Sequence, residues 1–321
     1  MAENSEQDDR GRHSGRPFAI PRTGWLDVAL RTGRAAFDDN VGLVAAGVAF
    51  YGMLAIFPGI AALISIYGLV ADPSEVRDQL QAASGVLPNG AFALLSDQMT
   101  QVSDSTAGAL SLAAAGGLLL ALWGASRITK AFMKAMNIAY GEDEERGFLR
   151  TNLTALALTV FILLTAAVAI GGIVILPIVL DGLGLGASAD RLIGVLRWPV
   201  IAAIFVGGLA LLYRFGPSRD RPRWRWVVPG CLAALALWLA ASIAFSVYVR
   251  DFGRYNETYG SLGAVIGMLM WLWLSAFAIL LGAELNAELE RQTRRDTTVG
   301  PHQPKGERGA HAADTVADRR R

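Results

Sequence analysis

The chain has 321 residues, of which 53% are hydrophobic and 18% are charged, and its formal net charge is +1. Soluble domains carry about 25% charged residues, so this composition is poor in charge. No Asp, Glu, Lys or Arg occurs between residues 41 and 70. As a helix this run would be about 45 Å long, against a hydrocarbon core of about 30 Å. The run therefore predicts a membrane span and excludes a soluble globular protein.

Further apolar runs predict six transmembrane helices joined by short polar connections. A helix satisfies its own backbone hydrogen bonds, which lipid requires. The predicted spans lie at about residues 41–70, 107–125, 153–180, 194–213, 227–249 and 262–285. The sequence therefore predicts an all-α polytopic membrane protein whose membrane domain covers residues 21–290.

The connections between these spans alternate in positive charge. Every second connection is rich in Lys and Arg, and together with both termini these segments hold 24 of the 29 Lys and Arg residues. Cytoplasmic loops of membrane proteins carry such an excess. We therefore expect a multi-pass protein of the cell (inner) membrane with both its N-terminus and its C-terminus in the cytoplasm.

Two segments at the cytoplasmic face have the pattern of amphipathic helices. Apolar residues recur at helical spacing within 26–37, before the first span, and within 128–140, after the second. Basic residues lie beside both, so each segment predicts a helix that lies in the membrane interface.

The longest extracytoplasmic connection, 71–106, predicts a pair of short amphipathic helices. Asp72-Pro73-Ser74-Glu75 has the features of a helix start, and Pro88-Asn89-Gly90 separates the two helices. The pair would lie on the outer leaflet, close over a central cavity as a lid, or pack as a surface decoration. The sequence leaves these alternatives open.

The terminal segments 1–20 and 291–321 are polar and poor in aromatic residues, and they predict disordered cytoplasmic tails. The histidines, His13, His302 and His311, all lie in these tails. A metal site needs clustered His, Cys, Asp or Glu side chains, and no such cluster is visible. No phosphate-binding loop or nucleophile motif occurs either. We therefore expect no metal, no cofactor and no enzymatic activity.

Ionisable and helix-breaking residues inside the predicted spans are candidate functional residues, because lipid makes them costly. Arg197, near the outer end of the fourth span, would either snorkel to the interface or face a substrate path. Glu284, near the cytoplasmic end of the sixth span, would either pair with Arg127 or Lys130 or act as a gating carboxylate. Pro58 removes a backbone hydrogen bond within the first span, which frees a carbonyl either to line a cavity or to bind a neighbouring helix.

Small residues recur inside the predicted spans and indicate close helix packing. They are the pairs Gly116-Gly117, Gly171-Gly172 and Gly207-Gly208, and the spaced pair Gly263 and Gly267. Nothing in this pattern distinguishes contacts within one chain from contacts between copies.

Two polar-aromatic segments lie next to the predicted spans. Tyr255, Asn256, Glu257 and Tyr259 form a cluster just outside the sixth span, which would recognise a lipid headgroup or a partner protein. Alternating Arg and Trp residues in 221–226 resemble a nucleic-acid patch, but beside a span this pattern favours an anchor on an anionic leaflet. We therefore expect no nucleic-acid partner.

Three stretches of this sequence resemble the YihY/virulence factor BrkB family of bacterial inner-membrane proteins, formerly described as ribonuclease BN. They are Ala49-Phe50-Tyr51 leading to Phe57-Pro58, Ala135-Met136-Asn137 with Tyr140-Gly141, and Tyr259-Gly260-Ser261-Leu262 through Trp271 to Gly282-Ala283-Glu284-Leu285. The resemblance covers about residues 25–290, with a departure at Trp273, where the family more often has tyrosine. It implies a six-helix inner-membrane fold without an established biochemical activity. It also adds Tyr51 and Asn137 to the candidate cavity or gating residues.

A largely apolar interior with few charges favours a transporter, or a protein that translocates lipids or other amphiphiles, in the bacterial envelope. Its partners would be membrane lipids and a lipid or amphipathic substrate. The alternative is a non-catalytic envelope scaffold that binds a partner protein. The residues do not favour a ribonuclease, since they include neither a zinc-ligand cluster nor a histidine pair inside the membrane domain. Substrate, direction, energy source and oligomeric state are left open by the sequence.

Overall fold

The computed structural model describes residues 10–70, 107–182, 186–251 and 261–317. Within 56–70, 107–115, 166–182 and 186–197 it describes the backbone and not the side chains. The predicted helix pair at 71–106 therefore lies outside the described residues.

The described elements are helical apart from one isolated β-bridge between Pro222 and Thr298, which confirms the all-α prediction. A short 3-10 helix, η1 (Pro17–Ala19), precedes α2 (Arg22–Asp38). The long helices are α3 (Val41–Val70), α6 (Ala107–Tyr140), α7 (Phe148–Gly182), α8 (Gly186–Phe215), α9 (Trp224–Asp251) and α11 (Ser261–Gln292). A short helix, α12 (His311–Asp314), follows near the C-terminus.

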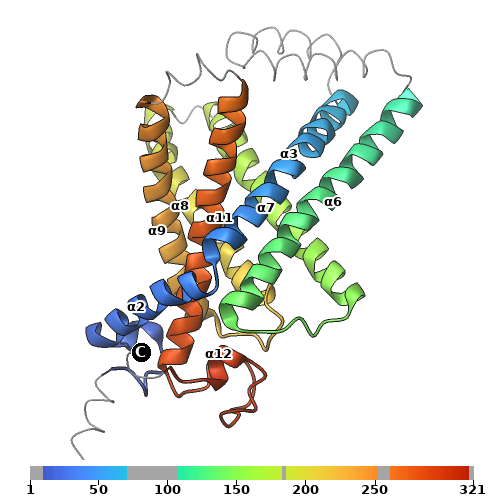
Figure 1. Ribbon diagram of the computed structural model, residues 1–321. Coiled ribbons are helices and arrows are strands. Elements are labelled where there is room, and N and C mark those ends of the chain that lie inside the picture. The colour runs from blue at the N-terminus through green and yellow to red at the C-terminus, as the bar shows by residue number, and fades with distance from the viewer. Residues whose placement is uncertain (1–9, 71–106, 183–185, 252–260, 318–321) are drawn as a thin grey trace, which may run out of the picture.

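α11 is the central helix of the bundle. It packs against α3, α6 and α9, and it also contacts α2 and α12. The remaining long helices pack in chain order, with α6 against α7, α7 against α8, and α8 against α9. Figure 1 shows that α2 lies across the same end of the bundle as α12. The two described ends of the chain therefore meet at one end of the protein.

Four helices are long and apolar enough over their described residues to cross a membrane. These stretches are Phe148–Thr165, Trp198–Phe215, Trp224–Arg250 and Val265–Gln292. In the most apolar 18-residue window of Trp224–Arg250 only 6% of the residues are buried inside the protein, so most of this apolar surface faces outward. Such a surface is stable in lipid and not in water. The two other predicted spans, in α3 and α6, stay predictions, because many of their side chains lie outside the described residues.

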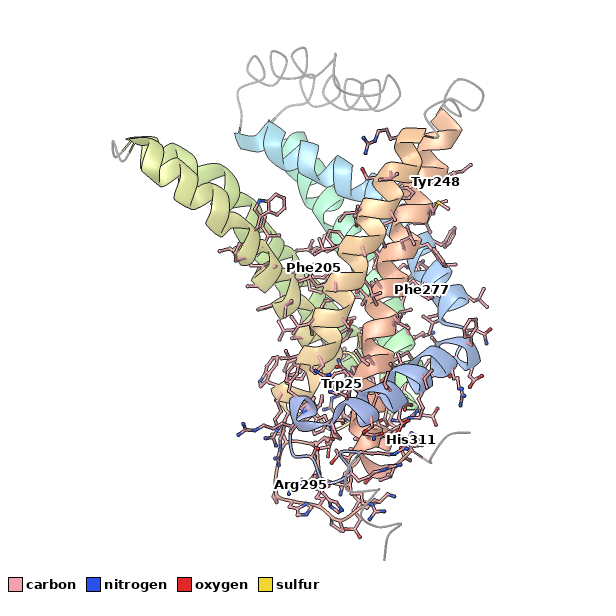
Figure 2. All side chains as sticks on the ribbon, turned by 90° about the vertical axis from the view of Figure 1, so that its left-hand side faces the viewer. Trp25, Phe205, Tyr248, Phe277, Arg295 and His311 are labelled. Carbon is pink, nitrogen blue, oxygen red and sulfur yellow. The ribbon has the colours of Figure 1, made fainter. Side chains whose placement is uncertain are left out.

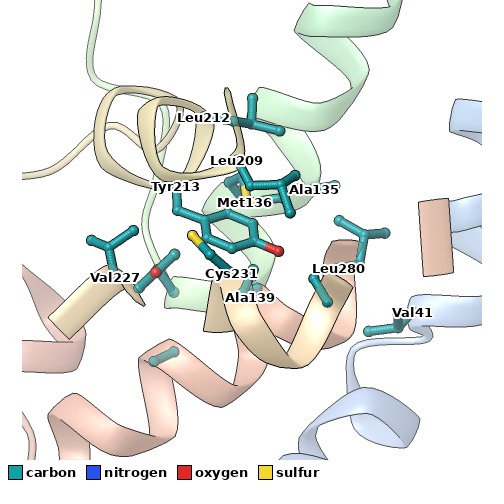
Figure 3. Packing of buried hydrophobic residues seen from close by; sticks show 14 of the residues in the cluster. Val41, Ala135, Met136, Ala139, Leu209, Leu212, Tyr213, Val227, Cys231 and Leu280 are labelled. Atoms are coloured by element: carbon teal, nitrogen blue, oxygen red, sulfur yellow. The ribbon is translucent and has the colours of Figure 1, made fainter. Parts of the chain in front are cut away.

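The largest apolar core lies in the half of the bundle nearest α2. Small side chains dominate it, among them Ala45 of α3, Ala139 of α6, Ala234 of α9 and Ala283 of α11. Tyr213 of α8 fills the space between these helices (Figure 3), and its side chain is fully buried. Alanine at these positions lets helices approach closely, and larger side chains such as Tyr213 fill the remaining gaps.

The closest helix crossing joins α9 and α11 at two glycines that the sequence pattern did not single out together. A Cβ atom built on Gly230 would overlap the carbonyl oxygen of Gly282, and one built on Gly282 would overlap that of Gly230. By contrast, a Cβ on Gly207 or Gly208 would meet nothing within 4 Å. The packing role predicted for this pair is therefore wrong within the described chain.

The two predicted interfacial helices have different outcomes. The segment 26–37 is helical in α2, and its apolar side chains Leu26, Leu30 and Phe37 are exposed while Val28 packs against the protein. This arrangement suits a helix whose outer face meets lipid. The separate interfacial helix predicted at 128–140 is wrong, because this segment continues α6 as one helix. Its apolar residues pack into the core and do not face the interface.

The predicted disorder of both termini is wrong for residues 10–20 and 293–317. Together with the α8–α9 connection, residues 216–223, they form a layer that we name the terminal cap. The Val299 N–H donates to the Arg221 carbonyl oxygen at 3.0 Å, and the Arg294 N–H donates to that of Arg12 at 2.9 Å. Figure 2 places Trp25, Arg295 and His311 at this end of the protein and Tyr248 toward the other end.

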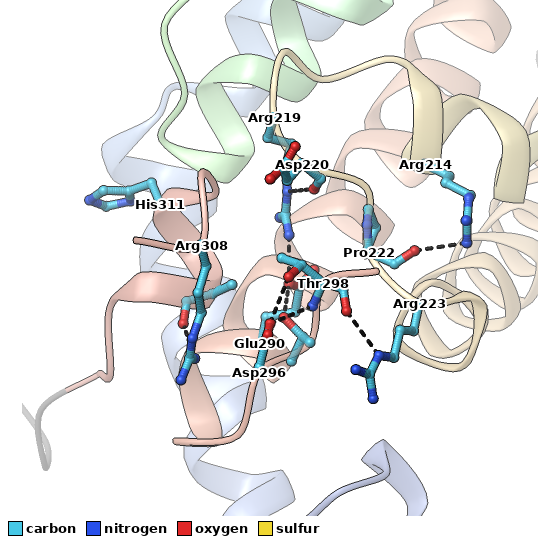
Figure 4. Close-up of polar contacts among 12 residues, drawn as sticks. Arg214, Arg219, Asp220, Pro222, Arg223, Glu290, Asp296, Thr298, Arg308 and His311 are labelled. Carbon is cyan, nitrogen blue, oxygen red and sulfur yellow. Dashed lines mark hydrogen bonds and ion pairs between the residues drawn. The ribbon is translucent and has the colours of Figure 1, made fainter. Parts of the chain in front are cut away.

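Polar contacts hold the terminal cap, and this explains why its composition suggested disorder. Arg219, whose side chain is fully buried, forms an ion pair with Glu290 of α11 at 2.7 Å (Figure 4). The Thr297 hydroxyl donates to the same carboxylate at 2.6 Å. Burial alone would lower the pKa of Arg219, but the charge of Glu290 and its hydrogen bond, together with Tyr140 and Glu142, outweigh burial and raise the pKa. The arginine therefore stays charged and binds the cap to the bundle.

The glycine crossing gives a first prediction. Gly230→Ala should destabilise the protein by about 1–3 kcal/mol, because the added methyl group forces two backbones apart. Thermal unfolding of the purified protein in detergent, followed by tryptophan fluorescence, measures the change. The matched control Gly207→Ala should keep or raise the melting temperature, since its methyl group enters open space and alanine favours helix by up to about 1 kcal/mol. Equal losses in both variants would contradict the assigned crossing.

Candidate functional site

Glu284 is the carboxylate predicted inside a membrane span, and its helix, α11, is held in place by the crossing with α9. Asn286 of α11 donates through its amide nitrogen to the Val227 carbonyl oxygen at 3.0 Å. It accepts from the Gly230 N–H at 2.8 Å. Both contacts lie in the first turns of α9, so this end of α11 is held against α9 by polar bonds as well as by close packing. Glu284 lies two residues before this anchor.

Glu284 is buried without a hydrogen-bond donor. Its side chain is 1% exposed, and neither carboxylate oxygen has a donor partner among the described residues. Glu288, one turn further along α11, is different, since it accepts from Arg31 at 2.6 Å and from Arg291 at 2.8 Å. A buried, unpaired carboxylate is costly, so the local environment favours a protonated Glu284.

The group that faces Glu284 is another carboxyl group. Asp39, in the turn between α2 and α3, is the acidic residue that acts most strongly on the Glu284 carboxyl group. An ionised carboxylate can only accept a hydrogen bond, so two carboxyl groups bond to each other when one of them carries a proton. We call Asp39 and Glu284 the carboxyl pair.

Burial raises the pKa of the Asp39 carboxyl above its ordinary value. The neighbouring Glu284 carboxyl group and the positive charge of Arg291 act in the opposite direction, but burial is the larger effect. Asp39 is only partly buried, unlike Glu284. The carboxyl pair thus extends from a sealed position in the bundle to the partly exposed turn between α2 and α3, where water can exchange protons with Asp39.

The sequence located one member of the pair and assigned it the wrong partner. Arg127, one of its predicted partners, instead lies over the ring of Trp123, with its guanidinium carbon 4.0 Å from the ring centre. Lys130, the other, forms no ion pair with Glu284 in the described part of the chain. Asp39 was missed, although it stands only two residues before the long charge-free run at 41–70. An acidic residue directly before an apolar span is the feature of the sequence that could have identified Asp39.

Asn137 lies elsewhere, as a structural link. It is buried, accepts from the backbone N–H of Ser218 at 2.7 Å and donates to Glu144 at 3.1 Å. The Glu144 carboxylate also accepts from Arg146, and this bond lowers the pKa of Glu144 despite partial burial. Asn137 therefore ties the end of α6 to the α8–α9 connection.

The other predicted site residues do not join the carboxyl pair in the described structure. Tyr51 is exposed on α3, edge-on to Phe50 with ring centres 5.9 Å apart. Pro58 and Arg197 lie within the helices α3 and α8, and their side chains are outside the described residues. The predicted recognition cluster of Tyr255, Asn256, Glu257 and Tyr259 lies outside them altogether. No group of three or more His, Cys, Asp or Glu side chains in the described ranges is placed to hold a metal ion.

Comparison with known proteins places this chain in a family. It is 29% identical over 260 residues to the ribonuclease-like protein YfkH of Bacillus subtilis, which covers 78% of this chain and 90% of that protein. It is 26% identical to a UPF0761 membrane protein of Tolumonas auensis, covering 80% and 83% of the two chains. It is 30% identical to one of Chromohalobacter salexigens, covering 88% and 68%. No solved structure matches it.

The family model of the virulence factor BrkB matches residues 33–307. This range includes all the long helices, and it extends past residue 290 into the terminal cap, further than the sequence resemblance suggested. The chain is a multi-pass membrane protein that belongs to the virulence factor BrkB (YihY/UPF0761) family.

Proposed function

We propose that this protein is a six-span transporter of the bacterial cytoplasmic membrane that moves a lipid or another amphiphile, with a proton bound by the carboxyl pair. The observation that carries the proposal is Glu284, sealed in a membrane helix with no donor for either oxygen. Ionisable groups in spanning helices mark substrate or proton pathways in membrane proteins. A purely structural role would favour a paired side chain such as Glu288.

The charges around the pair suit proton uptake. Two charged residues follow Glu284 along α11, Glu288 one turn away and Arg291 two turns away. Glu288 is already neutralised by Arg31 from α2 and by Arg291 itself. Little positive charge is thus left to hold Glu284 ionised. The carboxyl pair would bind one proton and release it when the surrounding helices move.

The proposal assigns both termini to the cytoplasm and no catalytic activity to the chain. The name of the Bacillus subtilis relative refers to a ribonuclease, but the described histidines offer little to such chemistry. His302 lies 3.7 Å from Asp296 on the exposed side of the terminal cap, and no second histidine joins it in a described metal cluster.

Topology is the first test of this proposal. In a Cys231→Ala background, Asn89→Cys should react with a membrane-impermeant maleimide in intact cells. Lys305→Cys, in the exposed part of the terminal cap, should react only after the membrane is permeabilised. Labelling of both cysteines in intact cells would place the cap outside and overturn the assigned orientation.

Transport is the second test. Purified protein in liposomes should accelerate the movement of a fluorescent phospholipid between leaflets, and Glu284→Gln should slow it about tenfold, within the range of typical coupling energies. Glutamine keeps the shape of the side chain but cannot release a proton. The matched control Asp38→Asn removes an exposed acid one residue from Asp39 and should transport normally. A rate no higher than that of empty liposomes, across several headgroups, would contradict the function.

The pH dependence of stability should reveal the proton that the carboxyl pair binds. Because the pKa of Asp39 is raised in the folded state, the native protein binds a proton more tightly than the unfolded chain. This contribution is present at acidic pH and is lost as the pH rises from about 3.9, the ordinary aspartate value, through the raised pKa. The melting temperature should therefore fall less steeply with rising pH in Asp39→Asn than in the unchanged protein or in Asp38→Asn. Identical slopes in all three proteins would rule out the shared proton.

A further inference from the structure

A groove of about 690 Å³ opens between α7 and α8 next to the terminal cap. It is separate from the carboxyl pair, since neither Asp39 nor Glu284 lines it. We name it the basic groove. Its polar end is formed by Arg146, Arg150, Arg214 and Arg221, and its apolar wall by Leu158, Phe161, Leu211 and Phe215.

Three of these arginines have no acidic partner. Arg146 is neutralised by Glu144 at 2.7 Å. Arg150, Arg214 and Arg221, however, form no ion pair with any described carboxylate, even though Glu145 and Asp220 also line the groove. The basic groove therefore carries an excess of positive charge beside an apolar surface.

The guanidinium groups of the groove are held close together despite their like charge. Two of them lie over the ring of Phe215, whose centre is 5.7 Å from the Arg214 guanidinium carbon and 4.9 Å from that of Arg221. Arg214 is fixed further by the Trp224 ring at 4.3 Å and by the Pro222 carbonyl oxygen at 2.8 Å (Figure 4). Its buried Nε has no hydrogen-bond partner among the described atoms. Converging cations with a free, buried donor are what an anion such as a phosphate requires.

The apolar wall continues from the arginines along one face of α7. Arg150, Thr154, Leu158 and Phe161 follow one another at helical spacing, and all of them line the groove. Leu158 and Phe161 lie in a stretch apolar enough to span a membrane, and Phe161 is half exposed. A soluble phosphate compound would leave this wall uncovered, whereas a lipid would cover it with its chains.

We propose that the basic groove binds the phosphate headgroup of an anionic phospholipid whose acyl chains lie along α7. This proposal names the substrate class of the proposed transporter. It rests on the proposed function only where it states that the bound lipid is then transported. The headgroup meets Arg150, Arg214 and Arg221, and the chains meet Leu158 and Phe161. The groove thus matches a molecule that is charged at the membrane surface and apolar below it.

The test is equilibrium binding of fluorescent phosphatidylglycerol to the full-length protein in detergent. Arg150→Ala and Arg221→Ala should each weaken binding about tenfold, since a charge-assisted hydrogen bond is lost. Phe161→Ala should weaken it as well. The matched control Arg225→Ala removes the same charge from an exposed site outside the groove and should bind normally. Melting temperatures establish that each variant is folded.

Competition identifies the ligand. Unlabelled phosphatidylglycerol should displace the probe, while phosphatidylcholine and glycerol 3-phosphate should not. Displacement by glycerol 3-phosphate at similar concentration would overturn the lipid assignment in favour of a soluble phosphate. If Arg225→Ala weakens phosphatidylglycerol binding equally, binding depends on general surface charge, and the assigned site is overturned.

The two proposals fail separately. Glu284→Gln should bind phosphatidylglycerol normally even though it transports slowly. Binding that depends on the groove arginines without any lipid movement in liposomes would leave the site standing and remove the transport function. If lipid movement is unchanged in Arg150→Ala and Arg221→Ala, the transport function stands and the basic groove is ruled out as the substrate site.

Discussion

The close approach of α9 and α11 is the constraint on which the rest of the structure depends. Because neither Gly230 nor Gly282 has a side chain, the two backbones touch, and Asn286 then reaches the first turns of α9. Glu284, two residues before Asn286, lies on the opposite side of α11, where it is buried and cannot extend to water as an isolated surface glutamate would. A carboxyl group held in such a place must find a proton or a cation, and the neighbour that the fold supplies is Asp39, another acid.

The sequence predicted the elements that depend on long-range apolar patterning, and it failed where contacts depend on geometry. Long runs that are apolar and nearly free of charge predicted the positions of the long helices in the described chain, because a membrane span needs a minimum length. The same runs could not say which glycines meet. Gly207 and Gly208 form a conspicuous pair and face open space, while Gly230 and Gly282 stand alone in the sequence and touch. The difference is set by how α9 and α11 cross, which no local pattern contains.

The terminal cap and the basic groove were missed for a related reason. Composition predicts order from apolar residues, but the cap is ordered by arginines: Arg219 pairs with Glu290, and Arg308 donates to the carbonyl oxygens of Ala313 and Arg294. The alternating Arg and Trp residues at 221–226 were interpreted as a membrane anchor, and the fold instead directs Arg221 into the groove. One positively charged segment thus serves both to fasten the cap and to shape a binding surface.

Helix α8 contacts α11, which carries Glu284 of the carboxyl pair, and it also lines the basic groove. Tyr213 of α8 is buried and donates to the Ile279 carbonyl oxygen of α11 at 2.6 Å, five residues before Glu284. The next residue, Arg214, lines the groove. With about 3.6 residues per turn, neighbours on a helix face different directions, so the same turn of α8 contacts α11 on one side and forms the groove wall on the other. Loss of a proton would leave a buried charge beside this contact, and any shift of α11 that relieves it moves Arg214 relative to Arg150. Such a continuous packed path is the physical basis on which proton binding and headgroup binding can be coupled.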